Sequence, residues 1–134
     1  MLSRDYIMRL LSDFTEALEK LIKEKKQKDG PEYQLQLQSM YRSYFNHTPE
    51  FYYDQDADYI LNDLQQQYEG DEFLIRVDML AELLYQDALT KQSEEQKYLL
   101  SKSLHLIEYL DKHSDTFSFE RRNKIQEIKR KIEE

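Results

Sequence analysis

The stretch from Phe73 to Ala88, FLIRVDMLAELLYQDA, decides the fold of this chain. Its apolar residues recur at spacings of three and four, which is the period of one face of an α-helix. Further apolar residues flank this stripe, and the face they form is too wide for a helix with one neighbour. The sequence therefore predicts a central helix that packs on two sides. The stripe is Phe73, Val77, Leu80, Ala81, Leu84 and Ala88, flanked by Leu74, Leu83 and Tyr85.

Three helices are predicted before this one. The first runs to about Lys26 and stops at Gly30-Pro31, because glycine and proline together interrupt a helix. The second spans about 31–45 and ends at Asn46-His47-Thr48-Pro49, and the third lies near 56–68. The apolar stripe of the first helix is Ile7, Leu10, Leu11, Phe14, Leu18, Leu21 and Ile22.

Two helices are predicted after the central one. Ser93 and Gln96 have the spacing of a capping box, which predicts a helix from Ser93 to about Lys112. This helix forms a hairpin with the central helix, and the small residues Ala81 and Ser103 permit a close approach between the two. The last helix begins at Phe119, after a turn.

The predicted fold is all-α, with about six helices in a compact stack of helical hairpins. The chain of 134 residues has the size of one domain, so residues 1–134 are assigned to a single unit. Only two glycines and two prolines are present, whereas a β-sandwich needs turn residues about every 8–12 positions.

Several classes of protein are excluded by what the sequence lacks. Without cysteine there is no disulfide framework, thiolate metal site or thiol nucleophile. No apolar run approaches the roughly 20 residues that cross a bilayer. The charged residues Arg4, Asp5 and Arg9 interrupt any signal-peptide core. We therefore expect a cytoplasmic protein that does not contact a membrane.

The net charge of −8 is concentrated in the middle of the chain, because both ends are slightly basic. An acidic body opposes binding to phosphate backbones, so no nucleic-acid partner is expected. Basic residues of the last helix leave nucleic-acid binding open as a weaker alternative, although glutamates are interleaved with them. These basic residues are Arg121, Arg122, Lys124, Lys129, Arg130 and Lys131.

No pattern of catalytic, cofactor-binding or metal-binding residues is present. The segment Asp54–Asp58 resembles the start of a calcium loop, but Tyr59 and Gln65 replace the required glycine and glutamate. His105 and Glu108 share a helix face, but a di-iron site needs further glutamates and a second motif. The sequence thus predicts no enzyme, cofactor or metal.

Aromatic residues are the most distinctive feature of the composition. The chain has eleven tyrosines and six phenylalanines, and many of them fall between residues 41 and 59. Tyrosine combines apolar area with a polar tip, which suits a binding surface and equally the edge of a core. Both interpretations stay open. The candidate protein-binding residues are Tyr41, Tyr44, Tyr52, Tyr53 and Tyr59.

Two segments carry a resemblance to a known family. The opening Asp5-Tyr6-Ile7-Met8-Arg9-Leu10-Leu11 and the segment Leu80-Ala81-Glu82-Leu83-Leu84, with the helical pair that follows, resemble a family of short bacterial proteins classed as a domain of unknown function. The resemblance implies a bacterial source and a tetratricopeptide-like helical fold. It implies no activity and no site residue.

The hairpin pattern and the missing catalytic residues favour a non-enzymatic scaffold that binds another protein. The partner is unknown, and self-association as a homodimer is one option. This expectation rests on analogy with helical-hairpin proteins. The alternative is a small-ligand sensor or an enzyme with a pocket among the helices, which would require convergent polar groups in a deep pocket.

Overall fold

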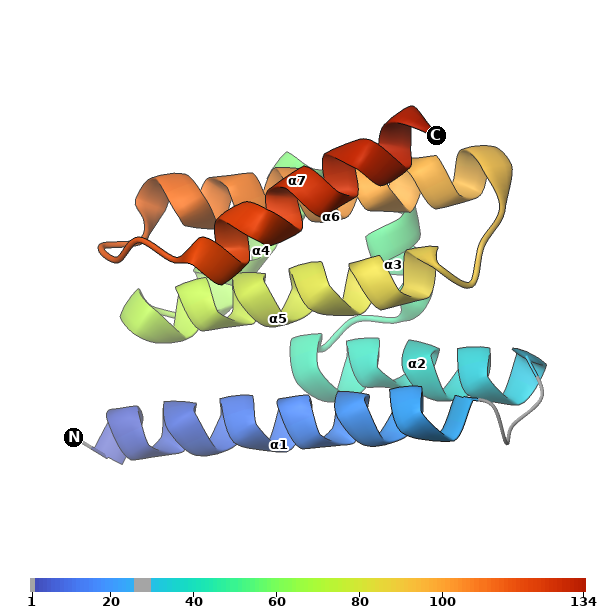
Figure 1. Ribbon diagram of the computed structural model, residues 1–134. Helices are drawn as coiled ribbons and strands as arrows, with labels where there is room; N and C mark the ends of the chain where they lie inside the picture. The colour runs from blue at the N-terminus through green and yellow to red at the C-terminus, as the bar shows by residue number, and fades with distance from the viewer. Residues whose placement is uncertain (1, 26–29) are drawn as a thin grey trace.

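The chain forms helices joined by short connections, as the computed structural model of residues 2–25 and 30–134 shows (Figure 1). The described residues contain no strand. Among these residues, no helix is both long and apolar enough to cross a membrane. The helices are α1 (Leu2–Glu24), α2 (Gly30–Phe45), α3 (Pro49–Asp54), α4 (Ala57–Gln67), α5 (Gly70–Ala88), α6 (Ser93–His113) and α7 (Phe119–Glu133).

Helix α5 is the centre of the fold, which confirms the prediction from its wide apolar face. It packs against α1, α2, α4 and α6, and in Figure 1 it lies between α1 and α7. Val77, Leu80 and Leu84 have no exposed surface. Burying such side chains fully contributes roughly 1.5–3 kcal/mol each. One continuous core joins all seven described helices around α5.

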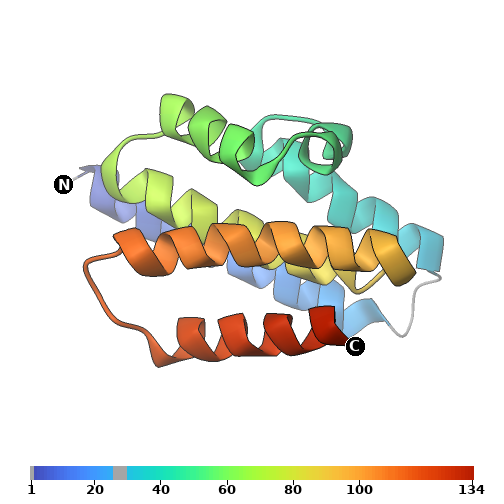
Figure 2. The same ribbon diagram turned by 90° about the horizontal axis from the view of Figure 1, so that it is seen from above.

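The helices α5 and α6 form the tightest hairpin of the fold. The Ser103 hydroxyl of α6 donates a hydrogen bond to the carbonyl oxygen of Ala81 on α5, at 2.7 Å. The two helices approach this closely because both positions carry small side chains, as the sequence predicts. Helix α7 then packs against α6, and Figure 2 shows α4 and α7 on opposite sides of α6.

Two local predictions are corrected by the structure. The sequence predicts no helix between residues 45 and 56, but the aromatic segment Phe51-Tyr52-Tyr53 belongs to a short helix, α3, because Pro49 occupies its first turn and fixes a helical φ there. The predicted capping box at Ser93 is absent. Gln92 is the N-cap of α6 and Ser93 has a φ of 53°, while the Gln96 amide donates instead to the carbonyl of Lys91.

The predicted ends of the first two helices differ in whether the structure describes them. Helix α1 ends at Glu24, and the predicted end at Lys26 lies outside the described residues. The predicted end of α2 is confirmed, because Asn46 follows Phe45 with a φ of 75°, in the left-handed conformation that often terminates helices.

Candidate interaction groove

Two adjoining hollows lie along α5, with volumes of about 870 and 270 Å³. They share the lining residues Asp78, Leu110 and Arg121, so they form one continuous depression. We call this depression the α5 groove. Helix α5 forms its floor, α1 lines one side, and α7 with the turn before it lines the other, while the end of α4 borders the larger hollow. Its position follows from the fold, because α5 lies between α1 and α7 in Figure 1.

The walls and floor of the groove combine apolar and polar side chains. On the α1 wall, Met8 is about half exposed, and Thr15 is exposed near the other end. Ile75 and Met79 give the floor an apolar part. A surface that offers both apolar contact and charge suits a segment with both characters.

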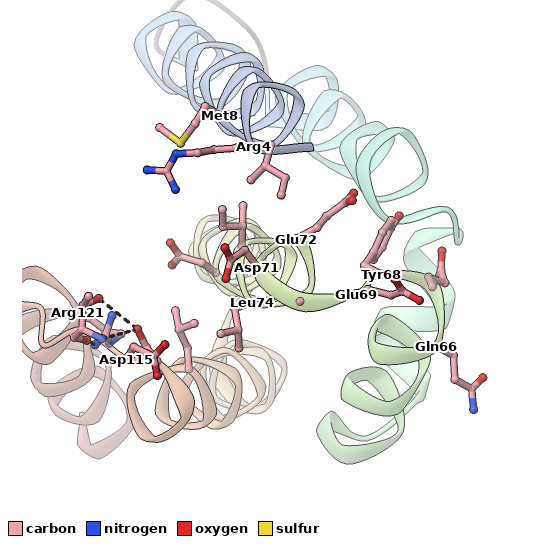
Figure 3. A pocket seen from close by; sticks show the side chains of 18 residues that line it. Arg4, Met8, Gln66, Tyr68, Glu69, Asp71, Glu72, Leu74, Asp115 and Arg121 are labelled. Atoms are coloured by element: carbon pink, nitrogen blue, oxygen red, sulfur yellow. Dashed lines mark hydrogen bonds between the residues drawn. The ribbon is translucent and has the colours of Figure 1, made fainter. Parts of the chain in front are cut away.

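The larger hollow wraps around the N-terminal end of α5, as Figure 3 shows. On one side, Arg4 and Met8 extend from α1 toward the opening that Arg121 borders from α7. On the other side, Tyr68 and Glu69 approach from the end of α4. The hollow is open to solvent, and it differs from the enclosed cleft that a small ligand fills.

Asp78 occupies the place where the two hollows meet, because its side chain lines both. The residue is exposed, yet its carboxylate makes no hydrogen bond or ion pair with the residues that the structure describes. The surrounding walls partly desolvate the carboxylate, which raises the pKa of Asp78 above its ordinary value. Glu82 and Glu120 add to this rise, while Arg121 opposes it.

Carboxylates outnumber basic groups around the groove. Two of the basic groups are already engaged, because Arg121 pairs with Asp111 at 2.9 Å and Lys124 lies 3.7 Å from Glu82. Glu72 is likewise paired, with Arg76 at 2.9 Å, but the acidic groups of the groove still outnumber the basic ones, so its net charge is negative. The acidic lining residues are Glu69, Asp71, Glu72, Asp78, Glu82, Asp115 and Glu120, and the basic ones are Arg4, Arg121 and Lys124.

The tyrosines that the sequence nominates lie away from this groove and differ in exposure. Tyr41 and Tyr52 have no exposed surface and stack on each other, with ring centroids 5.2 Å apart. Tyr44 and Tyr53 are half-buried, and Tyr59 is 54% exposed. A partner of the folded protein can touch only the last three. Their role in protein binding stays a prediction.

Two buried charged residues hold the aromatic segment in place. The Asp87 carboxylate has no exposed surface and accepts hydrogen bonds from the hydroxyls of Tyr41, at 2.8 Å, and Tyr53, at 2.5 Å. Lys102 is nearly buried, and its ammonium group donates to the carbonyl oxygens of Tyr52 and Gln55, at 2.7 and 2.6 Å. Buried charges persist where such partners compensate the lost water, so these two residues stabilise the fold.

Arg76 of α5 is also buried and contacts the last turn of α2. Its guanidinium donates to the carbonyl oxygen of Tyr44 and pairs with Glu72 at 2.9 Å. It also lies over the Tyr68 ring, 4.2 Å from the centroid, and donates to the Tyr6 hydroxyl at 3.3 Å. These contacts tie α1, α2 and the end of α4 to α5, beside the larger hollow of the groove.

The other residues considered in the sequence for metal or nucleic-acid binding make contacts within the fold. Asp56 is the N-cap of α4, because its carboxylate accepts from the Tyr59 amide at 2.8 Å. The His105 imidazole contacts Asp58 at 2.9 Å. Among the described residues, no group of three or more potential ligands is arranged to hold a metal ion. On α7, Arg122 pairs with Asp111 and Lys129 with Glu108.

Sequence reasoning missed Asp78 and the groove. Asp78 and Glu82 are four residues apart on a helix that is otherwise largely apolar, so they share one face of α5. This spacing is a usable signal of a polar strip on a central helix. It does not reveal which helices flank the strip or that they leave it uncovered.

The chain matches no family model, no curated protein and no solved structure. The family resemblance, the bacterial source and the tetratricopeptide-like arrangement therefore stay predictions from the sequence.

Proposed function

We propose that this protein is a non-enzymatic interaction module that binds another protein through the α5 groove. The observation that carries the proposal is the unpaired Asp78 carboxylate on the floor of a long, open depression. Leaving a partly desolvated charge without a partner costs stability, and surfaces that a fold leaves suboptimal in this way are typical of binding sites.

The shape of the groove favours a polypeptide over a small molecule. The depression extends along α5 from Gly70 to Glu82 and is open to solvent. A small ligand binds best where a cavity surrounds most of its surface, which an open depression does not provide. The sensor or enzyme alternative is therefore less well supported. A cytoplasmic location and the lack of a nucleic-acid ligand belong to the same proposal and rest on the sequence.

Site-specific photo-crosslinking tests the proposal. A small aliphatic diazirine amino acid, which is too small to fill the groove, is placed at Thr15, which lines the groove, or at its neighbour Glu16, which is exposed and lines neither hollow. Both variants are irradiated in lysate of the source cell, and adducts are identified by mass spectrometry. We expect one protein to be joined at Thr15 and not at Glu16.

Equal labelling at both positions, or no adduct at either, would contradict binding at the groove. The comparison is well matched because both positions are exposed on α1 and only one of the two side chains lines the groove. Circular dichroism of both variants establishes that each is folded before the lysate experiment.

A further inference from the structure

The charge of the α5 groove restricts the kind of partner that can bind there. Seven carboxylates and three basic side chains line its two hollows. Glu72 is paired with Arg76 and Glu82 lies near Lys124, and the carboxylates that remain still outnumber the remaining basic groups. An acidic segment would bring like charges together at close range, which costs binding free energy. A basic segment would meet a complementary field, which also accelerates its association.

Asp78 provides a specific point of attachment within this field. Its carboxylate is accessible from the groove and has no partner among the described residues. Water around it is already partly displaced by the walls, so an incoming guanidinium or ammonium group has less solvent to remove than at an open surface. An ion pair formed in such a place is stronger than one on an exposed helix.

Apolar side chains along the groove add a second requirement. Met8 is 53% exposed on the α1 wall, and Ile75 and Leu74 are partly exposed near the N-terminal end of α5. A purely basic peptide would leave this apolar area in contact with water. A segment with apolar residues beside its basic ones removes that area from water, at roughly 25 cal/mol per Å².

We infer that the α5 groove receives a cationic, amphipathic segment of a partner protein, with an arginine or lysine of that segment paired to Asp78. The inference rests on the proposed function and names the chemistry of the partner. The basic group of the segment forms an ion pair with the Asp78 carboxylate, and the apolar residues of the segment cover Met8 and Ile75.

Selection from a display library of random peptides with balanced charge tests this inference. The purified full chain is the bait, and enriched peptides are measured by fluorescence anisotropy against three variants. Asp78→Asn removes the proposed anchor, Glu16→Gln removes an exposed carboxylate outside the groove, and Thr15→Trp fills the groove from the exposed side of α1. Circular dichroism establishes that each variant is folded.

We expect enriched peptides to combine arginine or lysine with large apolar residues. Their dissociation constants rise about tenfold or more with Asp78→Asn, as the loss of one close charge pair implies. The dissociation constants stay unchanged with Glu16→Gln and rise strongly with Thr15→Trp. Replacing the anchoring arginine of a peptide by neutral citrulline weakens binding to the wild-type chain but adds little for Asp78→Asn.

The contrary outcomes separate this inference from the proposed function. Neutral or acidic peptides that depend on Thr15 would overturn the basic partner and leave the groove as a binding site. Peptides insensitive to Thr15→Trp, or no enriched peptide at all, would overturn both. A concentration-dependent dimer of the chain alone that excludes peptides would identify a second copy as the occupant and also overturn the inference.

Discussion

The Nζ atom of Lys102 lies 2.6 Å from the carbonyl oxygen of Gln55, which is the C-cap residue of α3. The same ammonium group donates to the carbonyls of Tyr52 and Tyr53, at 2.7 and 3.1 Å. These carbonyls belong to the last turn of a helix that is too short to be stable alone. A single cation from α6 therefore fixes the end of α3 and, with it, the aromatic core.

We predict that Lys102→Met lowers the free energy of unfolding by about 3 kcal/mol. The methionine side chain fills similar space but leaves several enclosed carbonyl oxygens without a donor. Lys97→Met is the matched control on the same helix, and its expected effect is within about 0.5 kcal/mol. Urea denaturation followed by circular dichroism measures both. Equal stability of the two variants would show that Lys102 does not hold α3.

A second prediction concerns the hydrogen bond between Tyr53 and Asp87. Tyr53→Phe should lower the free energy of unfolding by about 1–2 kcal/mol, because a buried carboxylate loses one of its two phenolic donors. Tyr59→Phe is the control, since Tyr59 is exposed and its hydroxyl has no hydrogen bond among the described residues. Thermal and urea unfolding of the pair give the comparison. A loss for Tyr59→Phe as large as for Tyr53→Phe would contradict the assignment.

How far the sequence predicts this fold depends on the range of the interactions involved. The stripe that contains Val77 and Leu84 predicts the central helix, because periodicity records which residues face inward. It does not say that Tyr41 and Tyr52 are buried. Their positions depend on Asp87 and Lys102, which follow 46 and 50 residues later along the chain. No local sequence pattern predicts a contact between residues so far apart along the chain.

The groove was beyond prediction for a related reason. Asp78 and Glu82 mark a polar strip on α5, but a polar strip on one helix predicts only exposure. A groove also requires the walls that α1 and α7 provide, and their separation depends on how each packs against its own neighbours. Helix α3 was missed because short helices lack the apolar periodicity that identifies longer ones.

A third prediction follows from the raised pKa values of the buried tyrosines. Desolvation is the main cause for Tyr41, Tyr52 and Tyr53, and Asp87 adds to the rise for Tyr41 and Tyr53. An unfolded tyrosine ionises near pH 10, so above that pH the unfolded chain releases protons that the folded chain retains. Stability contributed by these groups is therefore complete below about pH 10 and is lost as the pH rises further.

Alkaline titration measures this effect. Phenolate absorbance near 295 nm should rise first for the exposed tyrosines, and a second rise should coincide with the loss of helical circular dichroism. The reason is that the buried hydroxyls ionise only when the core opens. Complete ionisation of all tyrosines near pH 10 with the helices intact would contradict the buried network.

The fourth prediction separates the contribution of Asp78 to binding from its contribution to folding. Asp78→Asn should raise the free energy of unfolding at pH 7 by about 0.5 kcal/mol, a modest gain because the carboxylate keeps contact with water. The folded pKa of Asp78 is raised above the unfolded value, so the ionised form weakens the fold. The gain should be complete above the folded pKa and disappear below about pH 3, where the carboxylate is largely protonated in both states.

Urea denaturation of the wild-type chain, Asp78→Asn and Glu16→Gln at pH 7 and about pH 3 tests this prediction. Glu16 is exposed outside the groove, so its substitution should leave stability unchanged, within about 0.5 kcal/mol, at both pH values. A gain for Asp78→Asn that persists unchanged at about pH 3 would point to helix propensity as its source, and a loss at pH 7 would show that the carboxylate stabilises the fold. Suppose that Asp78→Asn gains stability only at the higher pH and also binds the selected basic peptides more weakly. The Asp78 carboxylate would then destabilise the fold at the place where the partner binds.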